Sequence, residues 1–374
     1  MMWRLVLLAV LIGFIAPAHA LETQAKQAMM IDAGTGAILF EKNADEPMHP
    51  SSMSKLMTAY AIFQRLEDGR MKMDDTLPVS EKAWRMQGSK MFVPYGERVR
   101  IEDLLRGVIV QSGNDACIVL AEGAAGSEEA FAQELEKTAK EIGLTSSTFR
   151  NSTGWPDPDH KMTARDLSVL AKHIINDFPQ YLPLYSEKEF TYHKIKQGNR
   201  NPLLYGFPGG DGLKTGHTEE AGYGLTGTAK RGDRRLIMVL NGLPSMKARA
   251  EESVRVLEWG FREFDNYRFF ASQDTLVKIP VWQGTREIVE AVSGQDIVLT
   301  LPRNKVDEVK VKVAYAKPAP APLQEGQEIG QISIEAPGQP VITLPLKAKQ
   351  AVERQNIFAR FFHNVSYLLA GSKT

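Results

Sequence analysis

The hydrophobic and polar residues of this chain follow two different periods, which predict strands at its ends and helices between them. Two short strand-like runs, 28–32 and 37–42, flank a Gly-Thr-Gly sequence and predict an opening β-hairpin. Apolar residues then recur at intervals of three and four, the spacing of amphipathic helices, in the segments 51–67, 101–125, 128–142 and 163–175.

The strand pattern returns after residue 212. Residues 222–228 and 235–240 are predicted strands, and 251–264 is a predicted closing helix. Because strands occur at both ends of this region, we expect an α/β (α+β) domain whose sheet is built from its two ends. After Phe270 the pattern changes to short alternating runs, separated by Gly- and Pro-containing turns, and these predict a small all-β domain.

The N-terminus has the tripartite pattern of a secretory signal. Arg4 precedes an apolar stretch, 5–15, and the small-x-small triplet Ala18-His19-Ala20 follows. The apolar stretch is shorter than the ~20 residues needed to cross a bilayer. We therefore expect cleavage rather than a retained anchor, and a protein that works outside the cytoplasm.

The C-terminal segment is predicted to be an amphipathic helix that lies in a membrane interface. Packing of the same helix against the all-β domain is the alternative interpretation. Arg360, His363 and Asn364 interrupt its apolar positions, so it is not expected to span a bilayer. On a helical projection the apolar arc consists of Ile357, Phe358, Phe361, Phe362, Val365, Leu368 and Leu369.

These patterns divide the chain into four parts. We predict a signal peptide at 1–20, the α/β domain at 21–270, the β-rich domain at 271–346 and the amphipathic helix at 347–374.

Composition narrows the range of functions. The 45 basic residues balance 45 acidic ones, and no long basic run precedes the C-terminus, so nucleic acid is not an expected partner. Cys117 is the single cysteine, which excludes an intramolecular disulfide, and we interpret it as a small buried apolar residue. The seven histidines show no metal-ligand spacing, so we expect neither a metal nor another cofactor.

The first candidate for chemistry is a serine three residues before a lysine at a predicted helix start. Ser52 and Lys55 follow Pro50, and this spacing places their side chains on one face of a helix. The lysine can take the serine's proton if it is neutral, a state that burial and nearby positive charge favour. By itself, the pattern also fits an ordinary helix N-cap beside a surface lysine.

Two further motifs favour the chemical interpretation. Ser112-Gly113-Asn114 interrupts an apolar helical pattern at a glycine that lets the chain turn and present a hydroxyl and an amide together. Lys214-Thr215-Gly216 lies on a predicted strand, where a glycine permits close approach of a ligand backbone. Each motif occurs once, and their joint occurrence in this order is far less expected by chance than any one of them.

With these motifs the chain resembles the low-molecular-mass penicillin-binding proteins, specifically the D-alanyl-D-alanine carboxypeptidases. The resemblance continues around the motifs and covers nearly the whole chain after residue 20. It implies a transpeptidase/β-lactamase-like α/β domain, a β-rich domain and a C-terminal membrane-binding helix. The matching segments are 112–117, 214–218, 221–223 and 259–261.

The function that this resemblance implies is removal of the terminal D-alanine from peptidoglycan pentapeptide stems. β-Lactam antibiotics would be covalent inhibitors of the enzyme. The enzyme would work in the periplasm, attached peripherally to the outer face of the inner membrane by its C-terminal helix. Whether it forms a homodimer, and whether it prefers the precursor or the polymerised wall, stay open.

The resemblance also assigns roles to individual residues. Ser52 resembles the acylated nucleophile, Lys55 its general base and Ser112 the proton relay to the leaving amine. Lys214 would keep the site positive, and the oxyanion would lie between the backbone N–H groups of Ser52 and His217. The implied substrate contacts come from Asn114, Lys214, Thr215, Gly216, His217 and Arg249. Arg249 would face the substrate carboxylate, with an ordinary surface position as the alternative.

Two rival functions are weighed against this one. A class A β-lactamase has the same three motifs but needs a glutamate in the loop before the 163–175 helix, and residues 149–166 contain none. Hydrolysis of a penicilloyl group from the enzyme should therefore be slow, so that β-lactams act as inhibitors rather than substrates. A catalytically inert periplasmic scaffold is the other rival, and the presence of Ser52, Lys55 and Lys214 argues against it.

Overall fold

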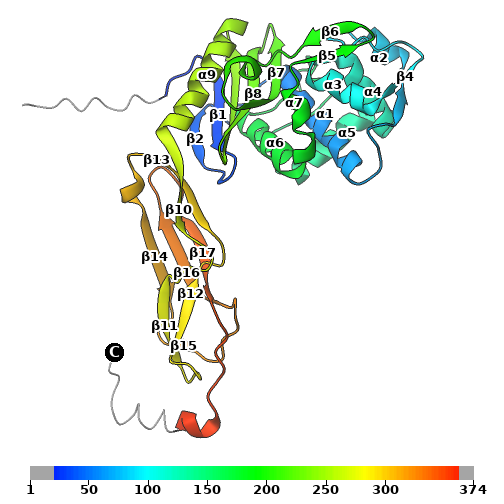
Figure 1. Cartoon of the computed structure of the whole chain (residues 1–374). Coiled ribbons are helices and arrows are strands. Elements are labelled where there is room, and N and C mark those ends of the chain that lie inside the picture. Colours follow the sequence, from blue (N-terminus) through cyan, green and yellow to red (C-terminus); the bar gives the residue numbers. More distant parts are fainter. Residues whose placement is uncertain (1–20, 362–374) are drawn as a thin grey trace, which may run out of the picture.

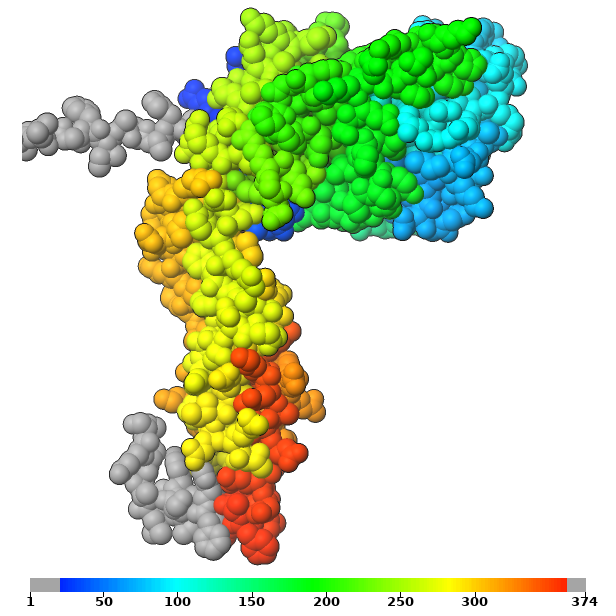
Figure 2. Space-filling view, viewed as in Figure 1, coloured from blue at the N-terminus to red at the C-terminus, as the bar shows by residue number. Residues whose placement is uncertain are grey.

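The computed structural model describes residues 21–361 and shows two domains of different shape. Figure 1 shows a broad α/β domain from which a slender all-β domain extends away at one end, so that the outline is L-shaped. The space-filling view in Figure 2 shows the same outline. The predicted signal peptide, 1–20, lies outside the described residues.

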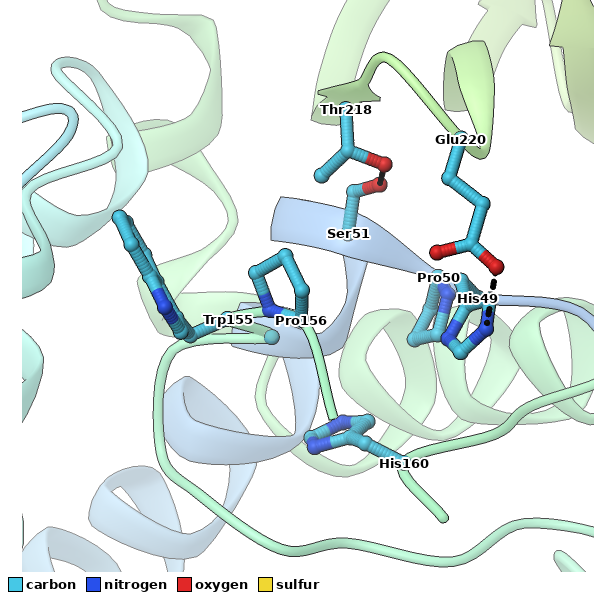
Figure 3. Close-up of a pocket in the computed structure, with 9 residues that line it drawn as sticks. His49, Pro50, Ser51, Trp155, Pro156, His160, Thr218 and Glu220 are labelled. Atoms are coloured by element: carbon cyan, nitrogen blue, oxygen red, sulfur yellow. Dashed lines mark hydrogen bonds and ion pairs between the residues drawn. The ribbon is translucent and has the colours of Figure 1, made fainter. Parts of the chain in front are cut away.

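The α/β domain is built on one antiparallel five-stranded sheet in the order β2-β1-β9-β8-β7. The two N-terminal strands pair with strands from the end of the domain, which confirms the sheet predicted from both ends. At the end of β7, Thr218 meets the turn before α1, where Ser51 Oγ donates to Thr218 Oγ1 at 3.4 Å (Figure 3). The strands are β1 (Gln27–Asp32), β2 (Ile38–Lys42), β7 (Gly210–Thr218), β8 (Gly222–Arg231) and β9 (Arg234–Leu243).

Helices cover both faces of this sheet, and alternate residues of β1 pack against the helices on opposite faces. Met29 and Ile31 on β1 belong to the apolar core beneath the main helical layer. Ala28 and Met30 point the other way, into the core beneath α9 (Met246–Glu263). Successive side chains of a strand alternate between faces, so an unbroken apolar run marks a strand buried on both sides.

The main helical layer follows the predicted segments, with one break. The predicted helix at 101–125 is two helices, α3 (Ile101–Ile109) and α4 (Asn114–Ala125), separated at the Ser-Gly-Asn motif. Ser112 there has a φ of 61°, a left-handed conformation that ends the first helix. The other helices of the layer are α1 (Lys55–Glu67), α5 (Glu128–Glu141) and α6 (Ala164–Asp177).

Serine and threonine caps set several helix starts. Ser127 and Thr163 accept the N–H groups of Ala130 and Asp166 at the first turns of α5 and α6. Ser245 does the same for α9, which therefore begins five residues before the predicted start at 251. The sequence patterns did not predict α2 (Glu81–Arg85), α7 (Pro183–Ser186), α8 (Leu203–Gly206), the β3–β4 pair (Thr76–Pro78, Arg98–Arg100) or the β5–β6 hairpin (Glu189–Tyr192, Ile195–Gly198).

The second domain is all-β, as predicted. A six-stranded sheet in the order β14-β16-β17-β12-β11-β15 shares one apolar core with the two-stranded sheet β10–β13. Its strands are β10 (Phe264–Phe270), β11 (Val277–Trp282), β12 (Ile288–Val292), β13 (Ile297–Pro302), β14 (Lys310–Tyr315), β15 (Ala319–Pro320), β16 (Glu328–Glu335) and β17 (Ile342–Ala348).

The limits of this second domain differ from those drawn on the sequence. Strand β10 pairs with β13, so the domain begins at Phe264, before the predicted boundary at 270/271. At the other end, Val352 is 1% exposed in the same core. Arg354 also forms a β-bridge with Gly284. Residues 347–355 therefore belong to the β-rich domain rather than to the predicted C-terminal helix.

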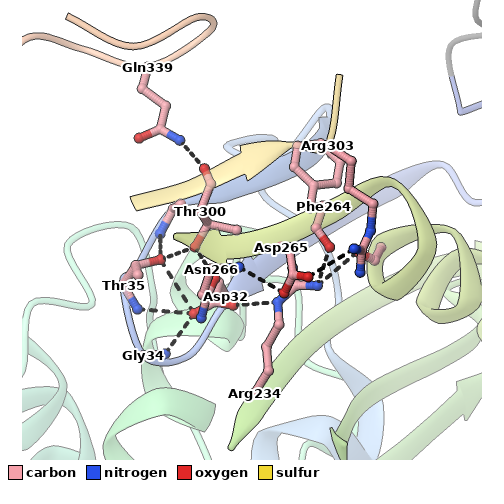
Figure 4. A network of polar contacts seen from close by, with 12 residues as sticks. Asp32, Gly34, Thr35, Arg234, Phe264, Asp265, Asn266, Thr300, Arg303 and Gln339 are labelled. Carbon is pink, nitrogen blue, oxygen red and sulfur yellow. Dashed lines mark hydrogen bonds and ion pairs between the residues drawn. The ribbon is translucent and has the colours of Figure 1, made fainter. Parts of the chain in front are cut away.

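A polar network joins the two domains (Figure 4). Asp32 is fully buried at the end of β1 and accepts a hydrogen bond from Arg234 Nε at 3.0 Å. The same carboxylate accepts the backbone N–H of Thr35, whose hydroxyl pairs with that of Thr300 on β13. Thr300 in turn donates to Asn266 Oδ1 at 2.7 Å. The junction is therefore held by directional hydrogen bonds.

A short helix begins after the second domain, at Ile357, and is described as far as Phe361. Asn356 caps it, because its side chain accepts the Ala359 N–H at 2.8 Å. The exposed fractions of Ile357 and Phe358 are 67% and 75%. The rest of the predicted amphipathic arc, from Phe362 onward, lies outside the described residues. Between residues 21 and 361 no helix is long and apolar enough to cross a membrane.

Candidate active site

Ser52 and Lys55 lie at the junction of a 3-10 turn, Ser51–Ser54, with helix α1. Lys55 Nζ is 2.8 Å from Ser52 Oγ and 2.6 Å from the carbonyl oxygen of Thr153. Ser51, just before the pair, has a φ of 50°, a conformation that non-glycine residues rarely adopt. The structure therefore brings together the serine and the lysine that the sequence paired.

The lysine of this pair is buried. Lys55 is 1% exposed, and burial lowers its pKa to about 8. The positive charge of Arg200 lowers the pKa further, whereas Cys117 and Asp115 raise it. A neutral amine, able to accept the Ser52 proton, is thus accessible at mildly alkaline pH. Cys117 is itself fully buried, as predicted, and its burial raises the thiol pKa to about 12.

A second serine and lysine meet across the cleft. Lys214 Nζ on β7 is 2.9 Å from Ser112 Oγ at the break between α3 and α4. Lys214 is 3% exposed, and burial lowers its pKa well below the ordinary range, with Lys55 and Arg200 acting in the same direction. The two lysines therefore disfavour each other's charge.

The Ser-Gly-Asn motif is fastened to the segment that precedes it in the chain. Asn114 Nδ2 donates to the Gln87 carbonyl at 2.8 Å. Asp115 is fully buried, and its carboxylate accepts the backbone N–H groups of three consecutive residues, Met91, Phe92 and Val93. These bonds hold the motif in place, with Ser112 lining the cleft and Asn114 behind its lining residues.

Strand β7 forms the opposite wall of the cleft and is the edge strand of the sheet. A Cβ added to Gly216 would lie 2.8 Å from the Pro50 carbonyl oxygen and 3.3 Å from the Met53 nitrogen. The glycine is therefore required because β7 approaches the turn that carries Ser52. The sequence had indicated a glycine that admits a ligand backbone, and the structure gives this additional, internal reason.

The cleft itself has a volume of about 270 Å³ and is lined by all three motifs. One end of it is basic, because Arg200 and Arg249 both line it, and their charges act on the nearby Lys214. Its lining residues are Ser52, Ser89, Ser112, Arg200, Thr215, Gly216, His217, Tyr223, Met246 and Arg249.

Arg249 is buried rather than on the surface, with an exposed fraction of 4%. Burial first, and then the charge of Arg200, lower its pKa to about 10. Its Nη2 donates to the Arg200 carbonyl at 3.2 Å, and its guanidinium lies 5.7 Å from the centre of the Tyr223 ring. The buried Nε has no hydrogen-bond partner among the described residues. Such a group is suited to an anionic ligand.

His217, the outermost of the predicted residues, stacks on the Tyr223 ring at 3.9 Å.

Comparison with known proteins decides the family. Residues 15–244, more than half of the chain, match the family model described as D-alanyl-D-alanine carboxypeptidase (peptidase S11). The chain belongs to the D-alanyl-D-alanine carboxypeptidase family. Residues 264–354 match the C-terminal domain of penicillin-binding protein 5, in agreement with the β-rich domain bounded above.

Two similar proteins cover about nine tenths of this chain, and a third covers 65% of it. D-alanyl-D-alanine carboxypeptidase DacC of Escherichia coli is 38% identical over 91% of this chain and 88% of its own length. The crystal structure of penicillin-binding protein 5 from Haemophilus influenzae aligns with a TM-score of 0.81 at 35% identity, covering 90% of this chain and 99% of that one. Penicillin-binding protein D2 of Listeria monocytogenes, solved in its ampicillin-bound form, aligns with a TM-score of 0.60 at 30% identity over 65% of this chain and 99% of that one.

The family site in this chain contains groups that the motifs did not predict. Arg200 contributes to the basic end of the cleft, and its Nη1 donates to Ser89 Oγ at 2.8 Å. Neither residue belongs to a motif with fixed spacing, so no sequence signal pointed to them. Thr153 acts through its backbone carbonyl, which any residue type can supply.

Proposed function

We propose that this protein is a serine-type D-alanyl-D-alanine carboxypeptidase that removes the terminal D-alanine from peptidoglycan pentapeptide stems through an acyl-enzyme on Ser52. The observation that carries the proposal is the contact between Lys55 Nζ and Ser52 Oγ, 2.8 Å, with the lysine buried and its pKa lowered to about 8. That pair is a nucleophile with an adjacent base.

The reaction then has two halves. Neutral Lys55 takes the Ser52 proton while Ser52 Oγ attacks the carbonyl carbon of the penultimate D-alanine. The backbone N–H groups of Ser52 and His217 stabilise the oxyanion, and loss of one such donor typically costs ~2.7 to 4 kcal/mol of transition-state stabilisation. The peptide C–N bond breaks as Ser112, hydrogen-bonded to Lys214, passes a proton to the leaving amine, and the proton that Lys55 took from Ser52 replaces the one that Ser112 gave up. Water then hydrolyses the ester and frees Ser52.

Substrate binding follows from the walls of the cleft. An extended peptide can lie against the edge strand β7 along Thr215, Gly216 and His217, with Asn114 on the other side. The carboxylate of the terminal D-alanine would bind at the basic end, where Arg249 has a buried Nε without a partner among residues 21–361. A carboxylate there gains charge-assisted hydrogen bonds.

β-Lactams are proposed as covalent inhibitors, because the strained amide offers Ser52 the same carbonyl. The ampicillin-bound structure of the Listeria relative supports this. Rapid release of the drug, as in a class A β-lactamase, would need a glutamate in the 149–166 loop. Glu128 reaches this loop from α5, but it accepts the N–H and hydroxyl of Ser152 and pairs with Lys82.

We also propose that the protein is exported and attached peripherally to the outer face of the inner membrane. The support is the signal-like pattern at 1–20 and the helix that begins at Ile357, whose first apolar side chains are exposed.

One experiment tests the proposed activity. The mature protein is incubated with a fluorescent penicillin, its intact mass is measured, and D-alanine release from a pentapeptide is assayed in parallel. A stable mass increase together with D-alanine release supports the proposal. Rapid loss of the label would indicate a β-lactamase, and no label with no D-alanine release would indicate an inert scaffold.

A further inference from the structure

A histidine outside the cleft makes contact with the turn that carries the nucleophile. His160 is 1% exposed and faces the same small pocket as Pro50 and Ser51 (Figure 3). Its Nε2 is 2.7 Å from Ser54 Oγ, on the residue just before Lys55. None of the three motifs contains this histidine, and the chemistry above does not use it.

The partners of the ring assign its tautomer. The backbone N–H of Arg150 donates to Nδ1 at 3.3 Å, so Nδ1 must be an acceptor. The neutral ring then carries its proton on Nε2, which donates to Ser54 Oγ. Burial lowers the pKa of His160 to about 4, so the neutral form prevails at physiological pH. Both ends of the ring are thus engaged, one by the loop and one by the turn before α1.

The 149–162 loop, which contains His160, supplies a hydrogen-bond acceptor to Lys55. Its Thr153 carbonyl is 2.6 Å from Lys55 Nζ, and its Ser152 carbonyl accepts from Thr58 Oγ1 at 2.6 Å. Gly154 follows with a φ of 73°, and a Cβ there would lie 1.9 Å from the Ser51 carbonyl oxygen. At Gly154 the loop therefore lies directly against the Ser51 carbonyl of the turn.

Other contacts anchor the two ends of this loop, so that the His160 ring has a fixed position relative to the turn before α1. The His160 ring meets the Phe149 ring edge-on at 5.5 Å. Met162 and Met48 exchange backbone hydrogen bonds at 2.8 and 3.0 Å. A ring that bonds to Ser54 from this anchored loop keeps residues 152–154 in register with the start of α1.

We propose that His160 is a positioning residue: its ring couples the 149–162 loop to Ser54, so that Ser52 Oγ and the Thr153 carbonyl both stay within hydrogen-bonding distance of Lys55 Nζ. This inference rests on the proposed serine–lysine chemistry and adds to it a group that touches neither substrate nor reacting atoms.

The expected consequence is on acylation rather than on substrate binding. Without the ring the loop loosens and water reaches Lys55, whose burial is the main cause of its lowered pKa. That pKa then rises toward its ordinary value, and the acidic limb of the rate profile moves to higher pH. The other titratable groups that face Lys55 are Asp115, Cys117, Arg200 and Lys214. Those facing His160 are His49, Lys55, Arg150 and Asp157.

The test compares His160→Ala, His160→Gln, Ser54→Ala and the double variant His160→Ala/Ser54→Ala in the full mature chain. For each variant the second-order rate of acylation by a fluorescent penicillin is measured from pH 6 to 10, together with kcat and KM on a pentapeptide and the melting temperature. His173→Ala is the matched control, since that histidine is partly exposed on α6 and paired with Asp177.

We expect His160→Ala to slow acylation by ~10- to 100-fold at pH 7, the loss typical of a small misplacement of reacting groups. The acidic limb should move up by ~0.5 unit or more, and KM should change by less than about threefold. His160→Gln, whose amide can still donate to Ser54 Oγ, should restore most of the rate. In the Ser54→Ala background the same histidine change should cost little more, because the two residues form one contact.

Several results would overturn the inference. One is an acidic limb that stays in place, and another is additive losses in the double variant. A loss that tracks only the melting temperature and is equal for Ala and Gln would also overturn it. If His160→Ala does not fold, His160→Gln and Ser54→Ala decide the outcome alone. A wild-type protein that takes no label would contradict the proposed function itself, whereas a normally labelled wild type with an unaffected His160→Ala would contradict only this inference.

Discussion

Lys214 and Ser112 are separated by 102 residues in the chain, yet Lys214 Nζ lies 2.9 Å from Ser112 Oγ. Like the contact between Lys55 and Ser52, it joins a buried lysine to a serine hydroxyl of the cleft. In the proposed mechanism these two buried lysines, each bonded to a serine, serve the attacking hydroxyl on one side and the leaving amine on the other. The proposed mechanism and the structure lead to the following predictions.

Ser52→Ala should abolish covalent penicillin labelling, because only Ser52 stands both three residues before Lys55 and within hydrogen-bonding distance of its Nζ. Ser51→Ala and Ser54→Ala should stay detectably labelled, although the second is expected to react more slowly. Gel fluorescence and intact mass measure the label. A Ser52→Ala protein that gained the mass of the drug would show that another residue is the nucleophile.

The acylation rate should rise with pH through about 8 and then level off. The base must be neutral, burial lowers the Lys55 pKa to about 8, and the neutral fraction grows as the pH rises through that value. Arg200→Gln removes a positive charge that lowers this pKa, so its acidic limb should move to higher pH. Arg70→Gln, an exposed arginine after α1, is the control. An Arg200→Gln limb at unchanged or lower pH would be inconsistent with this electrostatic account.

Arg249→Ala should impair cleavage of a peptide with a free C-terminus far more than cleavage of a thioester that lacks the terminal carboxylate. The reason is the buried Arg249 guanidinium at the basic end of the cleft: a substrate carboxylate would accept a hydrogen bond from its Nε, which has no partner in the described part of the chain. The ratio of kcat/KM on the two substrates is the measurement. Arg262→Ala, exposed on the same helix, should leave that ratio unchanged. Equal losses on both substrates would mean that Arg249 only supports the fold.

Truncation after Gln355 should give an active enzyme that does not bind anionic lipid vesicles. The cut retains Val352, which is buried in the core of the second domain, and removes the helix that begins at Ile357. A shorter protein that ends at Lys349 should be less stable, since burial of a valine side chain contributes ~1.5 to 3 kcal/mol. Vesicle sedimentation and thermal unfolding distinguish the two. Continued sedimentation of the protein that ends at Gln355 would rule out the proposed attachment.

The sequence predicted those parts of the structure that a local pattern determines. The β1–β2 hairpin, the helices that start at Lys55 and Glu128, and the meeting of Ser52 with Lys55 all follow from periodicity or from a spacing of three. The contact between Ser112 and Lys214 required the family resemblance, because no local pattern joins residues so far apart.

Other parts of the site could not be predicted, for physical reasons. The Thr153 carbonyl on Lys55 is a backbone group and has no side-chain signature. Arg200 reaches the cleft from a loop without periodicity. The second domain begins at Phe264 rather than Ala271 because strand pairing with β13, and not composition, decides where β10 belongs.

The bonded junction around Asp32, Thr35 and Thr300 has a consequence for where the enzyme works. Directional bonds at a narrow joint resist bending, so the all-β domain holds the catalytic domain at a set distance from its own far end (Figure 1). If the helix beginning at Ile357 binds the bilayer as proposed, that distance fixes the height of Ser52 above the lipid. The enzyme would then cleave stems only within one thin layer of the wall. Stems outside that layer would reach Ser52 only when the glycan strands that carry them move.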